Sequence, residues 1–518
     1  LPSLCEHGGA PLSVGKMNYD VIIVPGCETL RATTCERLSA FRKAGGRLIF
    51  MGDAPQYLDA VPSDIPAALY NSSEHVGFSR GALLGALACD RTVDIRQANG
   101  ELTNTLVHQL RRDGDGLWLF VAQGKLPYNK DISRKQKIKI SVKGIYSATV
   151  YDTMSGEIKP IRFSHSGGMT VITSELWMHD SLLLRLDTCA EDDAWRPAPA
   201  PKTVEVPLRA PECVPFSLSE SNALLLDRAE FSFDGGDFEP AEELLRIDTL
   251  LRRKLGWTPW GGSSNQPWCI PAEPTEHTVK LRFVIESKIP VNGAHLALEA
   301  AEDTAITLNG TPVPSAVDGY FTDRAIKTVP LPAIPAGMSV LELEMPFGTR
   351  TAIEWCYLIG SFGVRVTGSR AVIEELPETL GFDTITTQGL PFFSGCVSYF
   401  FDVNTTGGDL SVRLPQYRAA VYECSLDGGE PTVGAFAPYS VRWNGVPAGS
   451  HRVEVKLYIS RTNAFGHVHC ADRNLSYASP SAWRTGGDSW CYEYRLLEEG
   501  LIASPVFAEI KPVPTEKQ

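Results

Sequence analysis

The chain has 518 residues and a formal net charge of −13, with 43% hydrophobic and 21% charged residues. This composition is typical of a globular protein, and the length predicts roughly three to four domains. The acidic surplus argues against a nucleic-acid or anionic-membrane partner. No run of about 18 apolar residues is present, so the sequence predicts no membrane span.

The twelve cysteines are spread along the chain without a CxxC pair. This spacing favours reduced, mostly buried thiols over a disulfide framework or a zinc ribbon. The first residues, LPSLCEHGG, contain neither a Met nor a secretory signal pattern. We therefore expect a mature or proteolytic N-terminus, or a piece of a longer chain.

Residues 1–110 predict a partial α/β domain. Asp20–Gly26 and Arg47–Gly52 are short apolar runs typical of buried strands, and the amphipathic segment 33–44 between them predicts a helix that ends at Gly45. Such a βαβ unit implies parallel strands. Two strands and one helix cannot cover a parallel sheet, so we expect further strands from sequence before Leu1 or from another chain.

Period-2 alternation then predicts an Ig-like β-sandwich over 111–190, with strands at 117–121, 138–142, 148–151, 169–172 and 181–186. Residues 191–274 are interpreted as a linker because 195–215 is rich in proline. This linker contains a helix expected over 239–256 and a Trp-rich segment.

Two further sandwiches are expected over 275–367 and 368–518 because their sequences share a pattern. In each, a strand is followed by a strand that ends in Asn-Gly or Asp-Gly, and "PAG" then leads into an alternating strand. The expected fold class is therefore mainly β, with multiple β-sandwich or jelly-roll domains preceded by a partial α/β unit.

The motifs "LNGTPV", "GYFTD", "IPAGMSVLELEMPF" and "IEWCYLIGSFGV" resemble the galactose-binding-like jelly roll of glycoside hydrolase family 2. The stretches "NALLLDRAEFSFDGGDFEP", "LPFFSGCVSYFFDV" and "SRTNAFGHVH" resemble the non-catalytic half of large bacterial alpha-L-rhamnosidases of family 106. Residues 18–50 resemble the end of the amidotransferase-like (flavodoxin-like) domain of those enzymes. The resemblance follows nearly the whole chain in order.

This resemblance implies a carbohydrate or glycoside as ligand, and a catalytic (β/α)8 barrel that carries the paired carboxylates. A barrel needs about 250 residues of alternating strands and helices, which this sequence does not offer. The catalytic residues are therefore unknown. The expected partner is an N-terminal catalytic portion of the same protein or a second chain, and the expected location is bacterial and cytoplasmic rather than secreted.

Aromatic side chains are the first candidates for sugar contact, because a flat ring matches the C–H face of a pyranose. We single out Trp257, Trp260, Trp268 and Tyr320 as substrate-binding candidates. The alternative is that these rings pack between domains or in sandwich cores.

The stretch SRTNAFGHVHC, 460–470, suggests a metal site at first sight. In an extended strand His467 and His469 would point to one face and Cys470 to the other, so no tetrahedral zinc set forms. We therefore predict no metal and no cofactor, with calcium left open because jelly rolls of this resemblance commonly bind it. Arg461, Asn463 and His469 are predicted to serve domain docking or to line the rim of a sugar site.

Three functions remain open from the sequence. The first is an accessory region of a rhamnosidase-like glycoside hydrolase acting on plant or microbial glycans, which braces the barrel and contacts sugar. The second is a stand-alone carbohydrate-binding protein, and the third is an autonomous hydrolase with its acids on sandwich loops.

Overall fold

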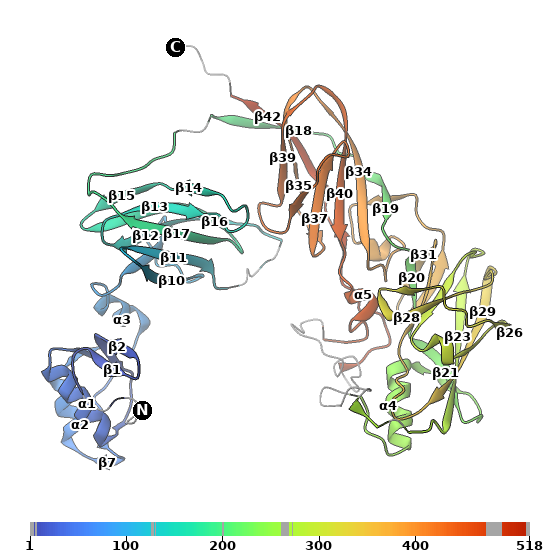
Figure 1. Ribbon diagram of the computed structural model, residues 1–518, viewed down its shortest axis with the longest axis horizontal. Helices are drawn as coiled ribbons and strands as arrows, with labels where there is room; N and C mark the ends of the chain where they lie inside the picture. Colours follow the sequence, from blue (N-terminus) through green and yellow to red (C-terminus); the bar gives the residue numbers. More distant parts are fainter. Residues whose placement is uncertain are drawn as a thin grey trace. The chain divides into compact units, whose positions relative to one another are not determined.

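The computed structural model describes residues 5, 8–125, 129, 131–198, 201–260, 269–271, 273–472 and 489–513. The chain forms two compact units (Figure 1). The first comprises residues 1–125, 135–176 and 181–197, and the second comprises 126–134, 177–180 and 198–518. Antiparallel sheets dominate, which confirms the predicted mainly-β class with an α/β part first. In the part of the chain described here, no helix is long and apolar enough to cross a bilayer.

The α/β part of the first unit contains a parallel sheet in the order β3–β5–β8. Its strands are β3 Val21–Val24, β5 Arg47–Met51 and β8 Glu74–Val76, and its helices are α1 Ala32–Lys43, α2 Asp64–Asn71 and α3 Arg80–Ala86. The expected βαβ unit is confirmed. The third strand, β8, escaped prediction because its sequence EHV has no apolar run. Shorter pieces are β1 Leu12–Val14, β2 Met17–Tyr19, β4 Thr29–Leu30, β6 Tyr57–Leu58 and β7 Val61–Pro62.

A β-sandwich completes the first unit. One sheet has the order β10–β11–β17–β13–β14 and the other β15–β16–β12–β9. The strands are β9 Val93–Gln97, β10 Leu106–Asp113, β11 Gly116–Gln123, β12 Lys135–Lys143, β13 Tyr146–Tyr151, β14 Ile158–Pro160, β15 Phe163–Ser166, β16 Met169–Trp177 and β17 Ser181–Thr188. All five expected strands are present. The expected boundary at 111 is wrong, because β9 and β10 pair with β12 and β11 and so belong to the sandwich.

The proline-rich segment expected to be a linker contains two strands, β18 Thr203–Leu208 and β19 Cys213–Leu218. β18 pairs with the last strand of the chain, and β19 pairs with two strands of the C-terminal sandwich. The linker interpretation of this segment is therefore wrong. Pro207 is tolerated because β18 is an edge strand, where one side needs no ladder hydrogen bonds.

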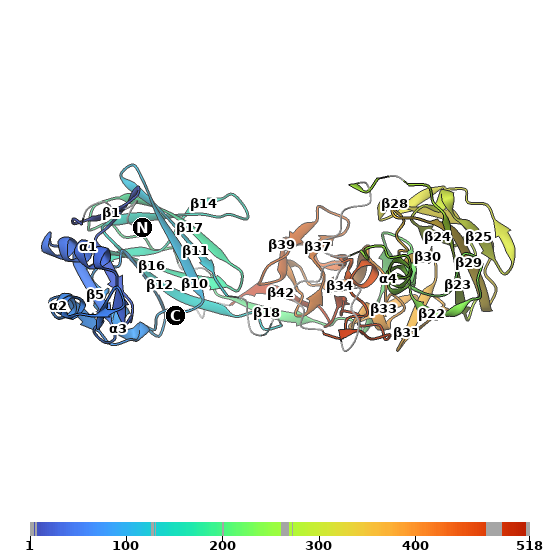
Figure 2. The same cartoon turned by 90° about the horizontal axis from the view of Figure 1, so that it is seen from below.

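The next sandwich has a five-stranded sheet, β20–β30–β24–β28–β27, that faces the sheet β22–β21–β23–β29–β25–β26, to which β31 and β32 attach. Its strands are β20 Asn222–Leu226, β21 Arg228–Phe233, β22 Glu239–Glu243, β23 His277–Ser287, β24 His295–Leu298, β25 Ala305–Leu308, β26 Thr311–Val313, β27 Gly319–Phe321, β28 Asp323–Pro330, β29 Gly337–Phe347, β30 Cys356–Gly360, β31 Gly363–Thr367 and β32 Arg370–Glu374. Figure 2 labels several of these strands, among them β23, β24, β29 and β30.

This sandwich starts at Asn222 rather than at 275, because β20 to β22 pair within its sheets. Helix α4 spans Leu244–Lys254, so the expected helix over 239–256 is confirmed in its centre while its first residues form β22. Glu243 caps the helix by accepting hydrogen bonds from the backbone N–H groups of Leu245 and Arg246.

The C-terminal sandwich combines the sheets β18–β42–β35–β39 and β33–β19–β34–β40–β37–β38. Its remaining strands are β33 Thr379–Gly381, β34 Cys396–Thr405, β35 Gly408–Arg413, β37 Val421–Leu426, β38 Thr432–Gly434, β39 Ser440–Val446, β40 Gly449–Tyr458 and β42 Val506–Pro512. A small separate pair joins β36 Tyr417–Arg418 to β41 Gly500–Leu501, and helix α5 spans Thr462–Phe465.

The shared Asn/Asp-Gly pattern of the two sandwiches has one geometry in both. Asn309 and Asp427 adopt left-handed φ values of 51° and 52°. Each backbone N–H donates to a carbonyl on the facing strand, that of Val340 or Arg452, at 2.8 Å. Each side-chain Oδ1 accepts the backbone N–H of that same residue, also at 2.8 Å. The pattern therefore marks a turn in which an Asx side chain bonds the facing strand.

Candidate functional site

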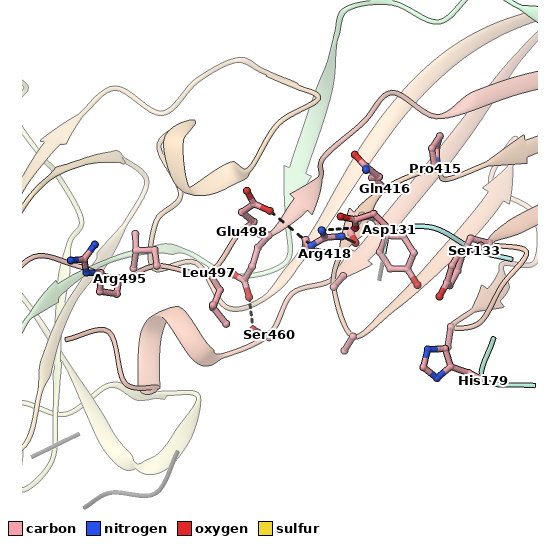
Figure 3. A pocket seen from close by; sticks show the side chains of 17 residues that line it. Asp131, Ser133, His179, Pro415, Gln416, Arg418, Ser460, Arg495, Leu497 and Glu498 are labelled. Carbon is pink, nitrogen blue, oxygen red and sulfur yellow. Dashed lines mark hydrogen bonds and ion pairs between the residues drawn. The ribbon is translucent and has the colours of Figure 1, made fainter. Parts of the chain in front are cut away.

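A cavity of about 750 Å³ lies in the second unit beside the small β36–β41 pair. Figure 3 shows the side chains that line it. Most come from β36 and the residues before it, from Tyr439, from Ser460 just after β40, and from the segment 495–499 just before β41. Asp131, Ser133 and His179 also line the cavity. Segments more than 80 positions apart thus meet because the β36–β41 pair holds Tyr417 opposite Leu501.

Two tyrosines form the aromatic wall of the cavity. The rings of Tyr417 and Tyr439 lie 5.5 Å apart and nearly perpendicular, and Tyr417 also packs edge-on against the buried Tyr422. Burial, with a smaller contribution from Tyr439, raises the pKa of Tyr417 to about 12. Its hydroxyl therefore stays protonated near neutral pH and can donate a hydrogen bond.

Polar groups also line the cavity. The guanidinium of Arg418 donates to Asp131 at 2.6 Å, and Glu498 lies 4.0 Å from the same guanidinium. The backbone carbonyl of Gln416 accepts the N–H groups of Ile502 and Ala503. The Gln416 side chain lines the cavity, and its amide has no hydrogen-bond partner among the described residues (Figure 3).

Glu499 forms a buried edge of the cavity and is only 3% exposed. Its carboxylate accepts hydrogen bonds from the Ser460 hydroxyl and, at 3.3 Å, from the Asn463 amide. Burial raises the pKa of Glu499 to about 7, against the opposing effect of these hydrogen bonds. Near neutral pH this carboxyl is therefore divided between its charged and neutral forms.

The two adjacent glutamates do not form a catalytic pair. Glu498 faces Arg418 at the exposed rim, whereas both oxygens of Glu499 are held by Ser460 and Asn463. Glycoside hydrolysis needs two carboxyl groups that face one bond from opposite sides. The cavity therefore has the character of a binding site with aromatic, hydroxyl, amide and guanidinium groups.

The stretch 460–470 is not an extended strand, because α5 begins at Thr462 and a turn follows. Asn463 is 1% exposed, and it holds the segment beside the cavity through hydrogen bonds with both backbone groups of Leu497. Arg461 is exposed and lies 3.9 Å from Glu220. The His/Cys/Asp/Glu side chains that the structure describes form no group of three or more able to hold a metal.

His469 is buried far from solvent at 2% exposure. Its Nε2 lies 2.6 Å from Oδ2 of Asp227, and its Nδ1 lies 3.1 Å from the Cys491 carbonyl. The other Asp227 oxygen accepts the Tyr494 hydroxyl at 2.7 Å. These bonds attach the segments around 469 and 494 to the end of β20.

A second buried carboxyl lies at the start of α4. Glu243 is fully buried and accepts the indole N–H of Trp355 at 2.6 Å as well as two helix N–H groups. Burial, with a smaller contribution from Asp227, raises the pKa of Glu243 to about 7. Every oxygen is bonded to protein, so Glu243 is a structural residue.

The tryptophan candidates do not form an open platform in the described part of the chain. Trp257 is half-buried and stacks on Phe347 at 5.6 Å, and the Arg252 guanidinium lies 4.3 Å from the Trp260 ring. Trp268 lies outside the described residues. Tyr320 is 57% exposed on β27, and it is not among the residues that line the cavity.

Sequence reasoning missed Gln416, Tyr417, Arg418, Tyr439 and Glu499. The only local signal was the run "PQYR", in which an amide, an aromatic ring and a cation follow a strand. The rest depends on chain segments that meet only in the fold.

No protein family and no curated protein matches the sequence. Among solved structures, a rhamnosidase from a Novosphingobium species is similar over 98% of this chain and 35% of its own, with 14% identity and a TM-score of 0.45. A Streptomyces avermitilis alpha-L-rhamnosidase complexed with L-rhamnose is similar over 81% of this chain and 39% of its own, with 13% identity and a TM-score of 0.21. A GH2 beta-galacturonidase from Eisenbergiella tayi is similar over 45% of this chain and 38% of its own, with 13% identity and a TM-score of 0.18. These structures are glycoside hydrolases, the likeness is loose, and this chain spans less than half the length of each.

Proposed function

We propose that this chain is an accessory region of a multidomain, rhamnosidase-like glycoside hydrolase acting on plant or microbial glycans. It braces a catalytic barrel, supplied by the same protein or a second chain, and contacts sugar itself. The cavity beside β36 carries this proposal, because it combines an aromatic wall with hydrogen-bonding groups and lacks converging carboxyl groups. The sequence motifs that resemble the rhamnosidase group support the enzymatic context.

The cavity suits a neutral sugar on three counts. Its volume of about 750 Å³ lies in the range of small-molecule sites. The tyrosine rings offer flat apolar surface, while their hydroxyls and the Gln416 amide can bond ring hydroxyls. Arg418 is already neutralised by Asp131, so the site carries little net charge toward an anion.

Calorimetric titration with L-rhamnose and short rhamnose-containing oligosaccharides tests this sugar contact. Gln416→Ala should weaken binding about fivefold, because a typical hydrogen bond contributes roughly 1 kcal/mol. Gln109→Ala is the matched control, since Gln109 is exposed on β10 in the first unit. Absence of binding, or equal weakening by both substitutions, would contradict the proposed site.

The accessory role has its own test. The chain alone should not hydrolyse aryl-rhamnosides, because its cavity has no carboxyl pair across a scissile bond. Turnover at an ordinary enzymatic rate would overturn the proposal in favour of an autonomous hydrolase.

The cavity also fits a stand-alone carbohydrate-binding protein, which is the second candidate. The intact mass of the source protein separates the two. A species near twice 56.6 kDa supports the accessory role, and a species of 56.6 kDa that binds sugar without a partner chain supports the alternative.

A further inference from the structure

A second cavity, of about 780 Å³, lies in the first unit on the sheet β15–β16–β12–β9. On β12, Ile138 and Ile140 point into the sandwich core and are at most 3% exposed. Side chains alternate along a strand, so Lys137 and Lys139 point to the outer face, where they line the cavity. We call this cavity, lined by Lys137, Lys139, Arg162, Glu175 and Trp195 among others, the outer groove.

The outer groove carries a positive surplus in an acidic chain. It holds three cationic side chains and one carboxylate, that of Glu175. Glu175 is already paired with Lys135 and lies 3.6 Å from Lys137, and the hydrogen bond with Lys135 is the main cause of its lowered pKa. Among the described residues, Lys139 and Arg162 have no acidic partner. Both are exposed, so an anionic ligand can reach them.

Trp195 gives the outer groove an aromatic wall. Its backbone exchanges two hydrogen bonds with Phe163, at 3.1 and 3.2 Å, and its half-buried ring packs against the sandwich core. The ring is thereby held in place beside the cations rather than free at the surface. A fixed flat ring next to unpaired cations offers two contacts that a pyranose with a carboxylate can make together.

We propose that the outer groove binds an acidic oligosaccharide, with uronate carboxylates on Lys139 and Arg162 and a pyranose face against Trp195. A volume of about 780 Å³ accommodates a short oligosaccharide rather than a single ion. A nucleic acid is a poorer ligand, because the net charge of −13 repels a long polyanion. This inference is independent of the cavity beside β36, which lies in the other unit.

Calorimetric titration of the full chain with tetragalacturonate, compared with neutral maltotetraose of the same length, provides the test. Binding of tetragalacturonate alone is expected at roughly 50 mM salt, with marked weakening at higher salt because these charges are exposed. The double variant Lys139→Ala/Arg162→Ala should bind about tenfold more weakly. Both substitutions are on the surface, and circular dichroism checks that the variant remains folded.

The double variant Arg111→Ala/Arg112→Ala is the matched control, because it removes the same charge from β10 in the other sheet of the sandwich. Its affinity should be unchanged. The proposal fails if tetragalacturonate does not bind, if maltotetraose binds equally well, or if both double variants weaken binding equally. Equal binding of a short oligodeoxynucleotide would also overturn it, since the groove would then attract any polyanion.

Discussion

Asp227 and His469 are 242 positions apart in the chain, yet Oδ2 of the first lies 2.6 Å from Nε2 of the second. Their side chains are 3% and 2% exposed, and the Tyr494 hydroxyl occupies the other oxygen of Asp227. Water cannot replace a partner lost at this depth. The contact therefore ties the turn after α5 to the end of β20.

Replacing Asp227 by Asn should destabilise the second unit by about 1–3 kcal/mol, because the amide keeps only one acceptor oxygen where the carboxylate offers one to His469 and one to the Tyr494 hydroxyl. Urea unfolding followed by tryptophan fluorescence measures the change. Asp318→Asn is the matched control, since the His295–Asp318 contact of 2.9 Å is 34% and 45% exposed. That substitution should cost less than about 1 kcal/mol. Equal costs would show that burial does not govern the Asp227 contact.

Glu499 should make the stability of the chain depend on pH. Its pKa is about 7 in the folded protein against 4.5 as the reference value, so the folded state binds the proton more tightly than the unfolded state. The free energy of unfolding from this group is then highest below about pH 4.5 and decreases as the pH rises to about 7. A difference of this size corresponds to about 3 kcal/mol across that window.

Glu499→Gln should flatten this decline, because glutamine cannot ionise yet keeps an oxygen for Ser460. The pKa of Glu243 is also raised to about 7, so Glu243 keeps part of the pH dependence of stability in this variant. Denaturant midpoints between about pH 5 and 8 measure the effect. Glu498→Gln is the neighbouring control at 63% side-chain exposure and should keep the wild-type slope. An unchanged slope in Glu499→Gln would contradict the assignment.

The strands of the first sandwich and helix α4 could be predicted from the sequence because their signals are local. Alternation at 117–121 and 138–142 follows from one buried face, and the leucines of α4 recur at helical spacing. The prediction of a linker over 195–215 was wrong, because it was based on the prolines of this segment. Proline lacks a backbone N–H for the strand ladder, but an edge strand tolerates this loss. β18 pairs with β42, the last strand, some 300 residues later in the chain. No local sequence pattern predicts a pairing over that distance.

The candidate site was harder to predict for the same reason. His469 and Asn463 were predicted to serve domain docking or to line the rim of a sugar site. In the fold both side chains are buried and bonded to residues distant in the sequence. The cavity residues carry no shared motif, because Ser460 and Glu499 meet only once β36 and β41 have paired. Trp260 drew attention as an aromatic platform, yet a cation from α4 covers it.

The Asp-Gly turn at 427–428 allows a test of how backbone conformation alone affects stability. Gly428 follows Asp427 with a φ of +72°, a left-handed conformation that strains residues with a Cβ, and an added Cβ there would meet nothing within 4 Å. Gly428→Ala should therefore cost about 1–2 kcal/mol through conformation alone. Gly428→Asn should cost clearly less despite its larger side chain, because Asn visits the left-handed region more readily. Urea unfolding of both variants measures the difference, and a greater cost for Asn would mean that crowding, not φ, selects glycine.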